Sequence, residues 1–238
     1  MRKVRADLHM HTCLSPCADE QMQAKAIVKQ ARRRGLDMIG ICDHNSAENV
    51  AAVVKAGLRE GLSVVAGMEI TSRQQVHILG LFENESDVMQ MQELVYRNLS
   101  EQSDEGSYGP QTLVDEWDHV VGTSHRLLVG ATALSAEQII DAIHERRGLA
   151  IASHMDRERF SLIGQLGFIP KGLHLDAVEV GQPSSAGRNY GYPVITSSDA
   201  HFLEDVGKSF TNFLVEELSL DEIRMALRGS DGRQVLLA

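Results

Sequence analysis

The sequence predicts an α/β fold in which short buried strands alternate with amphipathic helices. Residues 22–34, 47–60 and 136–147 carry apolar side chains at helical spacing. Because strand, helix and strand follow one another repeatedly, we expect parallel strands joined by right-handed crossovers. Seven short apolar runs have the length and composition of buried strands: 4–8, 38–42, 62–66, 76–81, 149–153, 177–180 and 194–196.

The helix ends carry their own signals. Gly35, Gly61 and Gly148 each follow one of the three helical segments. A left-handed C-cap favours glycine at such positions. Ser135 precedes the third helix, and its spacing to Gln138 is that of a capping box. These signals support the three helices in chain order.

Residues 87–130 interrupt the alternation of strands and helices. The segment opens with a helical pattern rich in Gln and Met and then passes through the polar SEQSDEGSYGP at 100–110. It closes with an expected strand pair around 112–115 and 119–121. We interpret it as a helix/strand insertion within a single barrel domain of residues 1–238, not as a second domain.

Length and composition fit an ordinary globular enzyme. The chain has 238 residues, and single α/β barrels often have roughly 200–250 residues. Lys plus Arg number 23 and Asp plus Glu number 33, so the formal net charge is −10. This balance disfavours non-specific binding to nucleic acid or to an anionic membrane. An anionic substrate stays possible, because bound cations reverse the field inside a pocket. Ten His against one Trp point to metal binding.

Nothing in the sequence predicts export or membrane insertion. Residues 1–8 lack the apolar core of a signal peptide, and no apolar stretch reaches about 18 residues. The three Cys give an odd number with no disulfide framework, which fits a reducing compartment. We therefore expect a cytoplasmic protein, and the sequence leaves its oligomeric state open.

Histidines and carboxylates follow the ends of the predicted strands. In a parallel β/α barrel these ends open on one face, and that face carries the active site. Imidazole and carboxylate ligands suit zinc, manganese or iron. His9 and His11 also lie two positions apart, so in a strand they point to the same side. In chain order the residues are His9 and His11, Asp43 and His44, Glu69, His77 within the fourth run, His154, Glu179, and Asp199 with His201.

Five segments resemble the ordered motifs of the PHP family, named for polymerase and histidinol phosphatase. The resemblance covers nearly the whole chain. It implies a distorted (β/α)7 TIM-like barrel, two or three divalent metal ions, and metal-dependent hydrolysis of phosphoesters. The segments are ADLHMHTCLS (6–15), ICDHN (41–45), GMEI (67–70), ASH (152–154) and SSDAH (197–201).

The resemblance also implies which residues bind the metals. One ion is held by the first His pair with two carboxylates. A second shares one of these carboxylates as a bridge, and a third lies between two further histidines. By site, the ligands implied are His9, His11, Glu69 and Asp199; then Glu69, His77 and His154; then His44 and His201.

One position departs from the family pattern. Many members have an Asp directly after the H-T-x-x-S segment, where it contributes to the third site, and here Pro16 takes that position. Cys17 or Asp19 could replace the missing ligand, and we place Asp19 slightly ahead. Cys17 would soften the site towards zinc or iron, whereas Asp19 would keep it hard. A dinuclear site is the other possibility.

The expected mechanism uses a water that the cations activate to a hydroxide nucleophile. The cations also stabilise the negative charge on the phosphoryl oxygens. We expect Asp43 to orient His44 or a neighbour instead of binding metal. Arg157, soon after His154, is a candidate to clamp phosphate, and Arg188 is a weaker one.

The sequence therefore predicts a metal-dependent phosphoric ester hydrolase. The favoured form is a phosphomonoesterase acting on a small phosphorylated metabolite or nucleotide. One alternative is a phosphodiesterase acting on nucleotides or oligonucleotide ends, and nucleic acid is expected only as such a short substrate. Others are a metal-dependent hydrolase of C–N bonds and a catalytically silent metal-binding module. Pro16 favours the silent module, and the intact His9 and His11 disfavour it.

Overall fold

The computed structural model describes residues 1–100, 108–185, 187–188 and 190–236. Nine strands form one sheet in the order β11-β10-β1-β2-β3-β4-β7-β8-β9, and β5 (Thr112–Val114) pairs with β6 (Val120–Thr123) in a separate hairpin. The strands of the large sheet are β1 (Arg2–Met10), β2 (Met38–Ile41), β3 (Ser63–Thr71), β4 (His77–Phe82), β7 (Leu149–Ala152), β8 (Ala177–Val180), β9 (Val194–Thr196), β10 (Thr211–Val215) and β11 (Gln234–Leu236).

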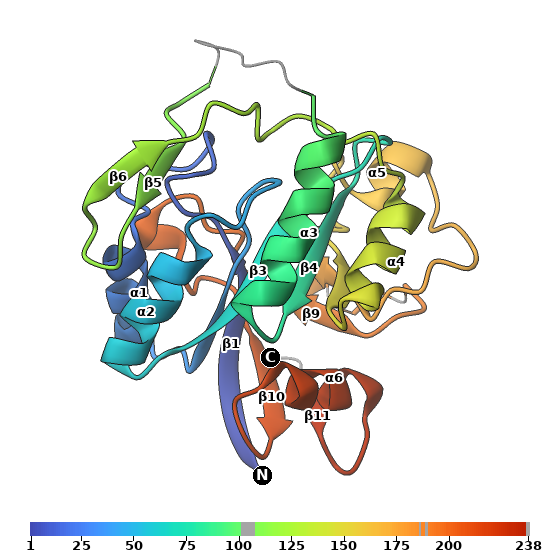
Figure 1. Ribbon diagram of the computed structural model, residues 1–238. Helices are drawn as coiled ribbons and strands as arrows, with labels where there is room; N and C mark the ends of the chain where they lie inside the picture. The colour runs from blue at the N-terminus through green and yellow to red at the C-terminus, as the bar shows by residue number, and fades with distance from the viewer. Residues whose placement is uncertain (101–107, 186, 189, 237–238) are drawn as a thin grey trace.

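The strands from β1 to β9 curl into a nearly closed barrel. Met10, at the end of β1, forms a parallel bridge with Ala200, just beyond β9. The His11 amide donates to the Ala200 carbonyl at 3.0 Å, and the Asp199 amide donates to the His9 carbonyl at 2.9 Å. The predicted (β/α)7 TIM-like barrel is confirmed. In Figure 1 β1 rises from the N-terminus, so the carboxyl ends of the parallel strands lie toward the top.

One strand of the barrel has the opposite direction to the one predicted. β4 pairs antiparallel with both β3 and β7, so the expectation of uniformly parallel strands is wrong there. Only residues 72–76 separate β3 from β4. A parallel connection needs a dozen or more residues to cross over, so this short link forces a hairpin. As a result, the first residue of β4 lies at the same end of the barrel as the last residue of β3.

Helices cover the outside and one end of the barrel (Figure 1). α1 and α2 pack side by side near β2 and β3, and α3 packs on β3 and β4. α4 covers β4 and β7, while α6 packs on β10 and β11 at the end away from the carboxyl rim. Their bounds are α1 (Ala24–Arg33), α2 (Val50–Glu60), α3 (Glu85–Asn98), α4 (Ala136–Glu145), α5 (Leu162–Leu166) and α6 (Leu220–Arg228), with 3-10 turns at Pro183–Ser185 and Leu203–Asp205.

The capping predictions are confirmed in part. Ser135 Oγ accepts from the Gln138 amide and Gln138 Oε1 accepts from the Ser135 amide, which completes the predicted capping box of α4. Gly61 ends α2 with φ +65°, in the left-handed region. The prediction for Gly148 is wrong, because Arg147 takes the left-handed conformation at that helix end, with φ +57°. An added Cβ at Gly148 would meet backbone and side chains closer than 3.0 Å.

The segment 87–130 contains both the predicted helix and the predicted strand pair. Val88, Met91 and Val95 of α3 are buried against the barrel, so this helix forms part of the barrel wall. The hairpin β5–β6 lies outside the barrel, and the Thr112 amide donates to the Cys13 carbonyl in the loop after β1. Residues 101–107 of the polar stretch lie outside the described part of the chain.

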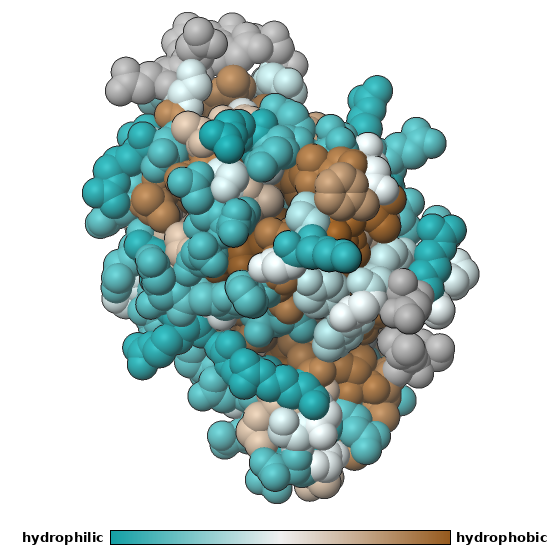
Figure 2. All heavy atoms as spheres, turned by 90° about the vertical axis from the view of Figure 1, so that its right-hand side faces the viewer, coloured by the Kyte–Doolittle hydropathy of each residue, from teal (hydrophilic) through white to brown (hydrophobic). Residues whose placement is uncertain are grey.

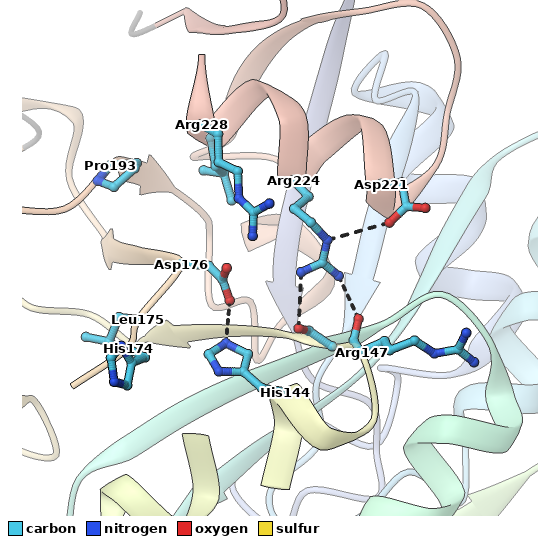
Figure 3. Close-up of a pocket in the computed structure, with 11 residues that line it drawn as sticks. His144, Arg147, His174, Leu175, Asp176, Pro193, Asp221, Arg224 and Arg228 are labelled. Carbon is cyan, nitrogen blue, oxygen red and sulfur yellow. Dashed lines mark hydrogen bonds and ion pairs between the residues drawn. The ribbon is translucent and has the colours of Figure 1, made fainter. Parts of the chain in front are cut away.

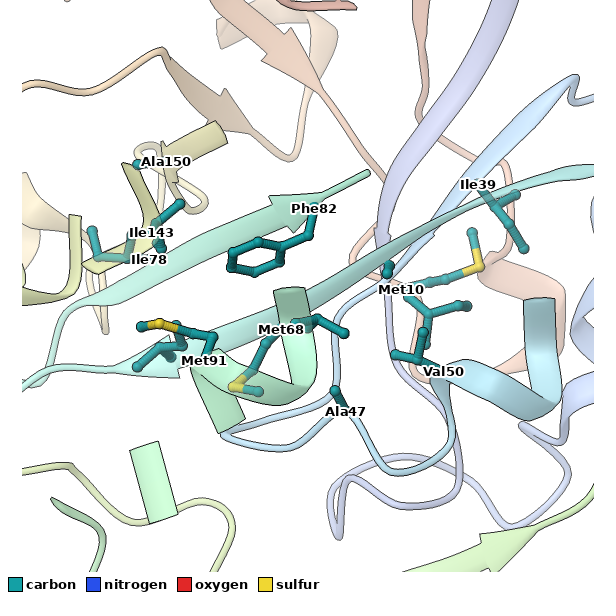
Figure 4. Close-up of a cluster of buried hydrophobic side chains, with 14 of the residues drawn as sticks. Met10, Ile39, Ala47, Val50, Met68, Ile78, Phe82, Met91, Ile143 and Ala150 are labelled. Carbon is teal, nitrogen blue, oxygen red and sulfur yellow. The ribbon is translucent and has the colours of Figure 1, made fainter. Parts of the chain in front are cut away.

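Two hydrophobic clusters fill the molecule. The larger lies between the sheet and its covering helices and contains Met68, Phe82, Met91 and Ile143 (Figure 4). The other lies inside the barrel, where side chains of the strands meet those of α6, and includes Leu8, Leu79, Ile151, Ile195, Leu220 and Ile223. The inner cluster closes the barrel end opposite the carboxyl rim.

The surface is polar over most of the face that carries α4 and α5. Figure 2 shows hydrophilic side chains over most of this face, with smaller apolar areas between them. Across the described residues, no helix combines the length and the apolar character that a membrane span requires.

Candidate metal centre

The structure brings the predicted metal-ligating residues to the carboxyl end of the barrel. His77 reaches this rim because β4 is antiparallel, which places its first residue opposite Thr71, the last of β3. All but one of the set are buried, and His201 is half-buried. Besides His77, the set consists of His9 and His11 at the end of β1, His44 after β2, Glu69 in β3, His154 after β7, and Asp199 with His201 after β9.

Four of these residues form a compact buried group. His9, His11, Glu69 and Asp199 offer ligand atoms that all lie within 4.8 Å of one another. The Nε2 atoms of His9 and His11 are 3.2 Å apart, and Asp199 Oδ1 lies 3.3 Å from the first and 3.0 Å from the second. Each Nε2 is also 3.5 Å from a Glu69 oxygen. Four side chains thus direct potential metal-ligand atoms at one point.

A β-bulge in β1 gives the two histidines this orientation. β1 has one residue more than β2 between their paired positions, so Leu8 and His9 both lie opposite Gly40. Leu8 packs in the inner cluster while Met10 packs in the outer one, so the alternation shifts at the bulge. A Cβ on Gly40 would lie 2.2 Å from the Leu8 carbonyl oxygen. The bulge therefore requires glycine at position 40.

Glu69 lies between three further imidazoles. Its Oε2 is 3.1 Å from His44 Nδ1, and its Oε1 is 3.0 Å from His77 Nδ1 and 3.3 Å from His154 Nε2. The two carboxylate oxygens thus face different histidines. His9 completes the surroundings on the β1 side. This arrangement suits the bridging role that the sequence predicts for Glu69, because each oxygen can serve a different cation.

Glu179 holds His9 from behind. Its two carboxylate oxygens lie 3.0 and 3.2 Å from His9 Nδ1, and both side chains are buried. A carboxylate only accepts, so His9 Nδ1 carries a proton, and Nε2 is the nitrogen left for a metal ion at the rim. Carboxylates behind ligating imidazoles fix the ring and strengthen the ligand. Glu179 therefore orients His9 in addition to packing beneath the site.

Asp43 orients His11 through Ser15. Asp43 Oδ1 accepts from Ser15 Oγ at 2.7 Å and from the Thr12 amide at 2.7 Å. Because the Ser15 hydroxyl proton is donated in the hydrogen bond to Asp43, Ser15 Oγ accepts from His11 Nδ1 at 2.9 Å and from the His44 amide at 3.1 Å. His11 Nε2 is then unprotonated and faces His9. The structure thus fits the predicted orienting role of Asp43, with His11 as its target.

The donor set fits divalent cations. His9 Nε2 and His11 Nε2 face each other at 3.2 Å with their other nitrogens already paired, so these two atoms are the nitrogens left for a metal ion. Within the described residues, the buried atoms Glu69 Oε1 and His44 Nδ1 have no well-formed hydrogen bond. Leaving such atoms without a partner is costly in a buried site. A cation between them would satisfy both features.

The electrostatics of the site favour added positive charge. Burial raises the pKa of Glu69, but the attraction of His77 and His9 lowers it by more, so the pKa lies well below its usual range. Burial likewise raises the pKa of Asp199, and His9 more than offsets this. Burial lowers the pKa of His9, yet Glu179, Asp199 and Glu69 raise it well above its usual range. The buried carboxylates stay ionised and attract a cation.

Two predicted ligands of the site have strained backbones. Asp199 has φ +49° and His154 has φ +31°, and neither residue is glycine. Phe160, which stacks on His77 at 4.5 Å between ring centroids, has φ +60°. Side chains disfavour the left-handed region, and strained residues of this kind cluster at functional sites.

The third predicted group is a set of imidazoles at the mouth of the site. His11, His44 and His201 offer nitrogen atoms within 4.8 Å of one another. Asp19 is not among the described residues of this group, and its Oδ1 accepts from the Gln21 amide at 2.8 Å within its own turn. Cys17 instead faces the group. Burial raises the pKa of its thiol, but His201 and His44 lower it to about 6.

The two predicted phosphate-binding arginines have different locations. Arg157 Nη1 lies 2.6 Å from Asp199 Oδ2, so its guanidinium borders the site. Arg159 lines the same cavity, although the sequence analysis did not select it. Its position two residues after Arg157, in the segment that follows His154, could have identified it. Arg188 is exposed and is not among the described residues that line this cavity, so the structure does not bring it to the site.

A cavity of about 390 Å³ opens above the histidines. Phe160 forms one wall, held by the stacking on His77 and by its carbonyl, which accepts from the His77 amide at 2.8 Å. Tyr108 and Val129, from the segment 87–130, form another. The sequence analysis missed these three residues, since loop positions without motif character carry no signal for a pocket wall.

A larger cavity, about 740 Å³, lies at the opposite end of the barrel (Figure 3). Arg224 crosses it, donating to the Arg147 carbonyl at 2.6 Å and pairing with Asp221 at 3.5 Å. His144 pairs with Asp176 at 2.9 Å. None of these residues belongs to a group of converging metal-ligand atoms among the described residues, unlike those of the rim. We therefore assign the candidate active site to the rim.

The chain matches two family models. Residues 7–165 match the model of the PHP domain, and residues 185–231 match the model described as PHP-associated. Uncharacterised protein YqxK of Bacillus subtilis is 26% identical over 270 residues, covering 99% of this chain and 65% of that protein. Phosphoribosyl 1,2-cyclic phosphate 1,2-diphosphodiesterase of Eggerthella lenta is 32% identical over 80 residues, covering 32% of this chain and 29% of that protein.

Solved structures share the fold. The lesion-specific endonuclease PfuEndoQ from Pyrococcus furiosus superposes with a TM-score of 0.73 at 21% identity, over 98% of this chain and 58% of that chain. Endonuclease Q with a 27-mer duplex carrying an abasic lesion at its active site gives 0.72 at 20% identity. At these identities the likeness shows the fold alone. The chain spans 65% of the length of YqxK and 58% of that of the endonuclease.

Proposed function

The chain belongs to the PHP domain family, and from this premise we propose that it is a metal-dependent phosphoesterase. The observation that carries the proposal is the convergence of the His9 and His11 Nε2 atoms and two ionised carboxylates on one point. Arg157 borders the same cavity and adds a phosphate-binding cation. Cation ligands and an arginine in one pocket are the parts that phosphoryl transfer requires.

We assign the cations to the groups that the geometry supports. His9, His11, Glu69 and Asp199 would hold one ion, and Glu69 with two histidines would hold a second. The second group is bounded by His77 and His154 on Glu69 Oε1 and by His44 on Oε2. The imidazole and carboxylate donors of both groups suit zinc, manganese or iron. Bound cations would supply an activated water and Lewis-acid polarisation of the phosphoryl oxygens.

The chain itself contributes positioning and charge. Glu179 and Ser15 keep the protons of His9 and His11 on Nδ1, which leaves Nε2 free for a ligand. Arg157 holds Asp199 in the described structure, and its half-exposed guanidinium can also reach a phosphate in the cavity. Guanidinium binds phosphate in a bidentate fashion and stabilises the charge that develops on it. Phe160 covers His77 and excludes water from that side.

We propose a small phosphomonoester as the substrate. The cavity of about 390 Å³ has the size of a pocket for a metabolite or a nucleotide, and Tyr108 and Val129 wall it in. A second candidate is a phosphodiester end. Two relatives favour it. The name of the Eggerthella lenta enzyme gives a cyclic phosphodiester as its substrate, and endonuclease Q binds a 27-mer duplex with an abasic lesion at its active site.

Phosphate release from a panel of esters tests the proposal. The protein is stripped with a chelator, reloaded with zinc, manganese or iron(II), and assayed for phosphate release on sugar phosphates, nucleoside monophosphates and histidinol phosphate. A bis-ester is assayed for release of its alcohol, because cleavage of a diester leaves a monoester and frees no phosphate. We expect release only from reloaded protein, with monoesters preferred. Preference for the bis-ester would move the assignment to phosphodiesters, and no release from any ester would contradict the proposed function.

A matched pair of variants links the activity to the rim. His9→Ala removes a buried donor of the first group, and we expect it to abolish hydrolysis. His119→Ala removes an imidazole whose side chain is 75% exposed and paired with Asp115, so activity should be unchanged. Circular dichroism of both variants checks that the barrel is retained. Full activity in His9→Ala would remove the metal assignment.

A further inference from the structure

We propose that Cys17 is a metal ligand: its thiolate, with His44 and His201, forms a third site that prefers a thiophilic cation such as zinc or iron(II). This inference rests on the proposed function, because it concerns the same rim. It adds a sulfur ligand to a centre whose other ligands are nitrogen and oxygen. Neither the family match nor the named relatives assign this residue.

The loop after β1 holds Cys17 between the two histidines. Before Cys17, Ser15 Oγ accepts from the His44 amide at 3.1 Å. After Cys17, the Asp19 amide donates to the His201 carbonyl at 2.9 Å. The Ala18 amide donates to the Ser15 carbonyl at 2.9 Å, which closes the turn around Cys17. Backbone contacts on both sides therefore fix this residue at the two imidazoles.

The side chain of Cys17 faces the site. It lines the cavity of about 390 Å³ together with His44 and His201. Cys13 and Cys42 are buried, whereas Cys17 is exposed, so it is the one cysteine of the chain that the cavity reaches. A thiol held against imidazoles gives up its proton readily to a bound cation.

The imidazoles supply the other half of the site. His11, His44 and His201 form a group with nitrogen atoms within 4.8 Å of one another. His201 Nδ1 lies 2.9 Å from the Asp199 carbonyl oxygen and donates to it, so Nε2 is left for a ligand. His44 Nδ1 faces Glu69 Oε2 at 3.1 Å, so Nε2 is the nitrogen of His44 that is left for this site. Two imidazoles and one thiolate are a ligand set that suits zinc.

The thiolate has a consequence for metal preference. Sulfur ligands select softer cations, while manganese and magnesium prefer oxygen. The group of His9, His11, Glu69 and Asp199 contains no sulfur ligand, so it accepts both softer cations and manganese. We therefore expect this site to discriminate against manganese more strongly than the group of His9, His11, Glu69 and Asp199. One centre would then hold ions of two preferences.

Cobalt(II) spectroscopy tests the inference without using activity. Cobalt(II) replaces zinc and gives a near-ultraviolet charge-transfer band only when a thiolate is bound. The chelator-stripped protein is titrated with cobalt(II) as wild type, as Cys17→Ser and as Cys13→Ser. Cys13 is the matched control, because its buried thiol contacts the Thr112 carbonyl instead of the cavity. We expect the band in wild type and Cys13→Ser, its loss in Cys17→Ser, and one fewer cobalt bound by Cys17→Ser.

Alkylation gives a second measurement that needs no variant. Iodoacetamide should modify Cys17 in the stripped protein and leave the buried cysteines intact. Zinc should slow this modification at least about tenfold, because a metal-bound thiolate is not free to react. Equal rates with and without zinc would overturn the inference, as would a band that persists in Cys17→Ser.

The results separate this inference from the proposed function. Cobalt binding without a charge-transfer band overturns the role of Cys17 but leaves a metal centre of nitrogen and oxygen ligands. A band in a protein that hydrolyses no phosphoester supports the thiolate site and contradicts the phosphoesterase. No cobalt binding at all contradicts both.

Discussion

Glu179 and His9 form a buried carboxylate–imidazole pair across the barrel, with Oε1 and Oε2 at 3.0 and 3.2 Å from Nδ1. The pair joins β8 to β1, two strands between which β2, β3, β4 and β7 lie in the sheet. It fixes which nitrogen of His9 carries the proton. The rim therefore depends on a residue that does not itself face the cavity.

Glu179→Gln tests this support. The amide still accepts from His9 Nδ1, but it no longer provides the negative charge that strengthens the imidazole as a ligand. We expect metal affinity to fall by roughly 10–100-fold, as for other carboxylates behind ligating histidines. Calorimetric titration of stripped protein with zinc measures it. Unchanged affinity would show that Glu179 only packs.

Gly40→Ala tests the bulge. The added Cβ would lie 2.2 Å from the Leu8 carbonyl oxygen, so β1 must move. We expect the free energy of unfolding to fall by roughly 3 kcal/mol and metal binding to weaken, because the bulge orients His9. Gly122→Ala is the control, since its nearest neighbour would be at 3.5 Å and the change should stay within about 0.5 kcal/mol. Urea unfolding of both variants makes the comparison.

Arg157→Ala tests phosphate binding. This change removes a guanidinium from the cavity while leaving all predicted metal ligands in place. We expect kcat/KM for the preferred ester to fall by about 10²–10³, which is typical for the loss of one transition-state donor. Arg188→Ala should have little effect, because Arg188 is exposed and away from the cavity lining. Equal losses in the two variants would point to bulk charge instead.

Metal removal tests the electrostatic argument. The ionised carboxylates of Glu69 and Asp199 are buried, so their repulsion is relieved by cations. At a zinc concentration about 100 times Kd, binding adds about 2.7 kcal/mol and should raise Tm by roughly 5–10 °C. Differential scanning calorimetry with and without a chelator measures the shift. Identical Tm values would argue against a cation at the rim.

Phe160→Leu tests the wall of the cavity. Phe160 stacks on His77 with its other side toward the cavity, so it offers a surface to a planar group. Stacking of a base on an aromatic ring contributes about 1–3 kcal/mol. We expect kcat/KM for nucleoside monophosphates to fall by about 10-fold or more, with a smaller effect on ribose 5-phosphate. An equal loss on both esters would assign Phe160 to positioning His77 alone.

The sequence predicted the barrel and the identity of the rim residues well, because both depend on local order. Strand ends followed by His, Asp or Glu can be read directly along the chain, as at His9, His44 and Asp199. The direction of β4 was missed, although the five residues before it already excluded a crossover. That short link was the available signal.

Contacts between distant residues could not be predicted in the same way. The choice of Cys17 over Asp19 depends on a turn in which the Cys17 side chain faces His201, whereas the Asp19 carboxylate accepts from the Gln21 amide of the same turn. The route from Asp43 through Ser15 to His11 depends on the geometry of three loops. Arg188 follows a strand end as Arg157 does, but its loop does not return to the cavity.

The central claim is that cations bind at Glu69 on the carboxyl rim. Anomalous X-ray diffraction from crystals soaked in zinc, recorded on both sides of its absorption edge, locates the ions directly. We expect one peak about 2.0–2.2 Å from ligand atoms of His9, His11, Glu69 and Asp199, with further density on the opposite side of Glu69. Zinc-dependent hydrolysis by a protein whose crystals show no anomalous peak at Glu69 would contradict it.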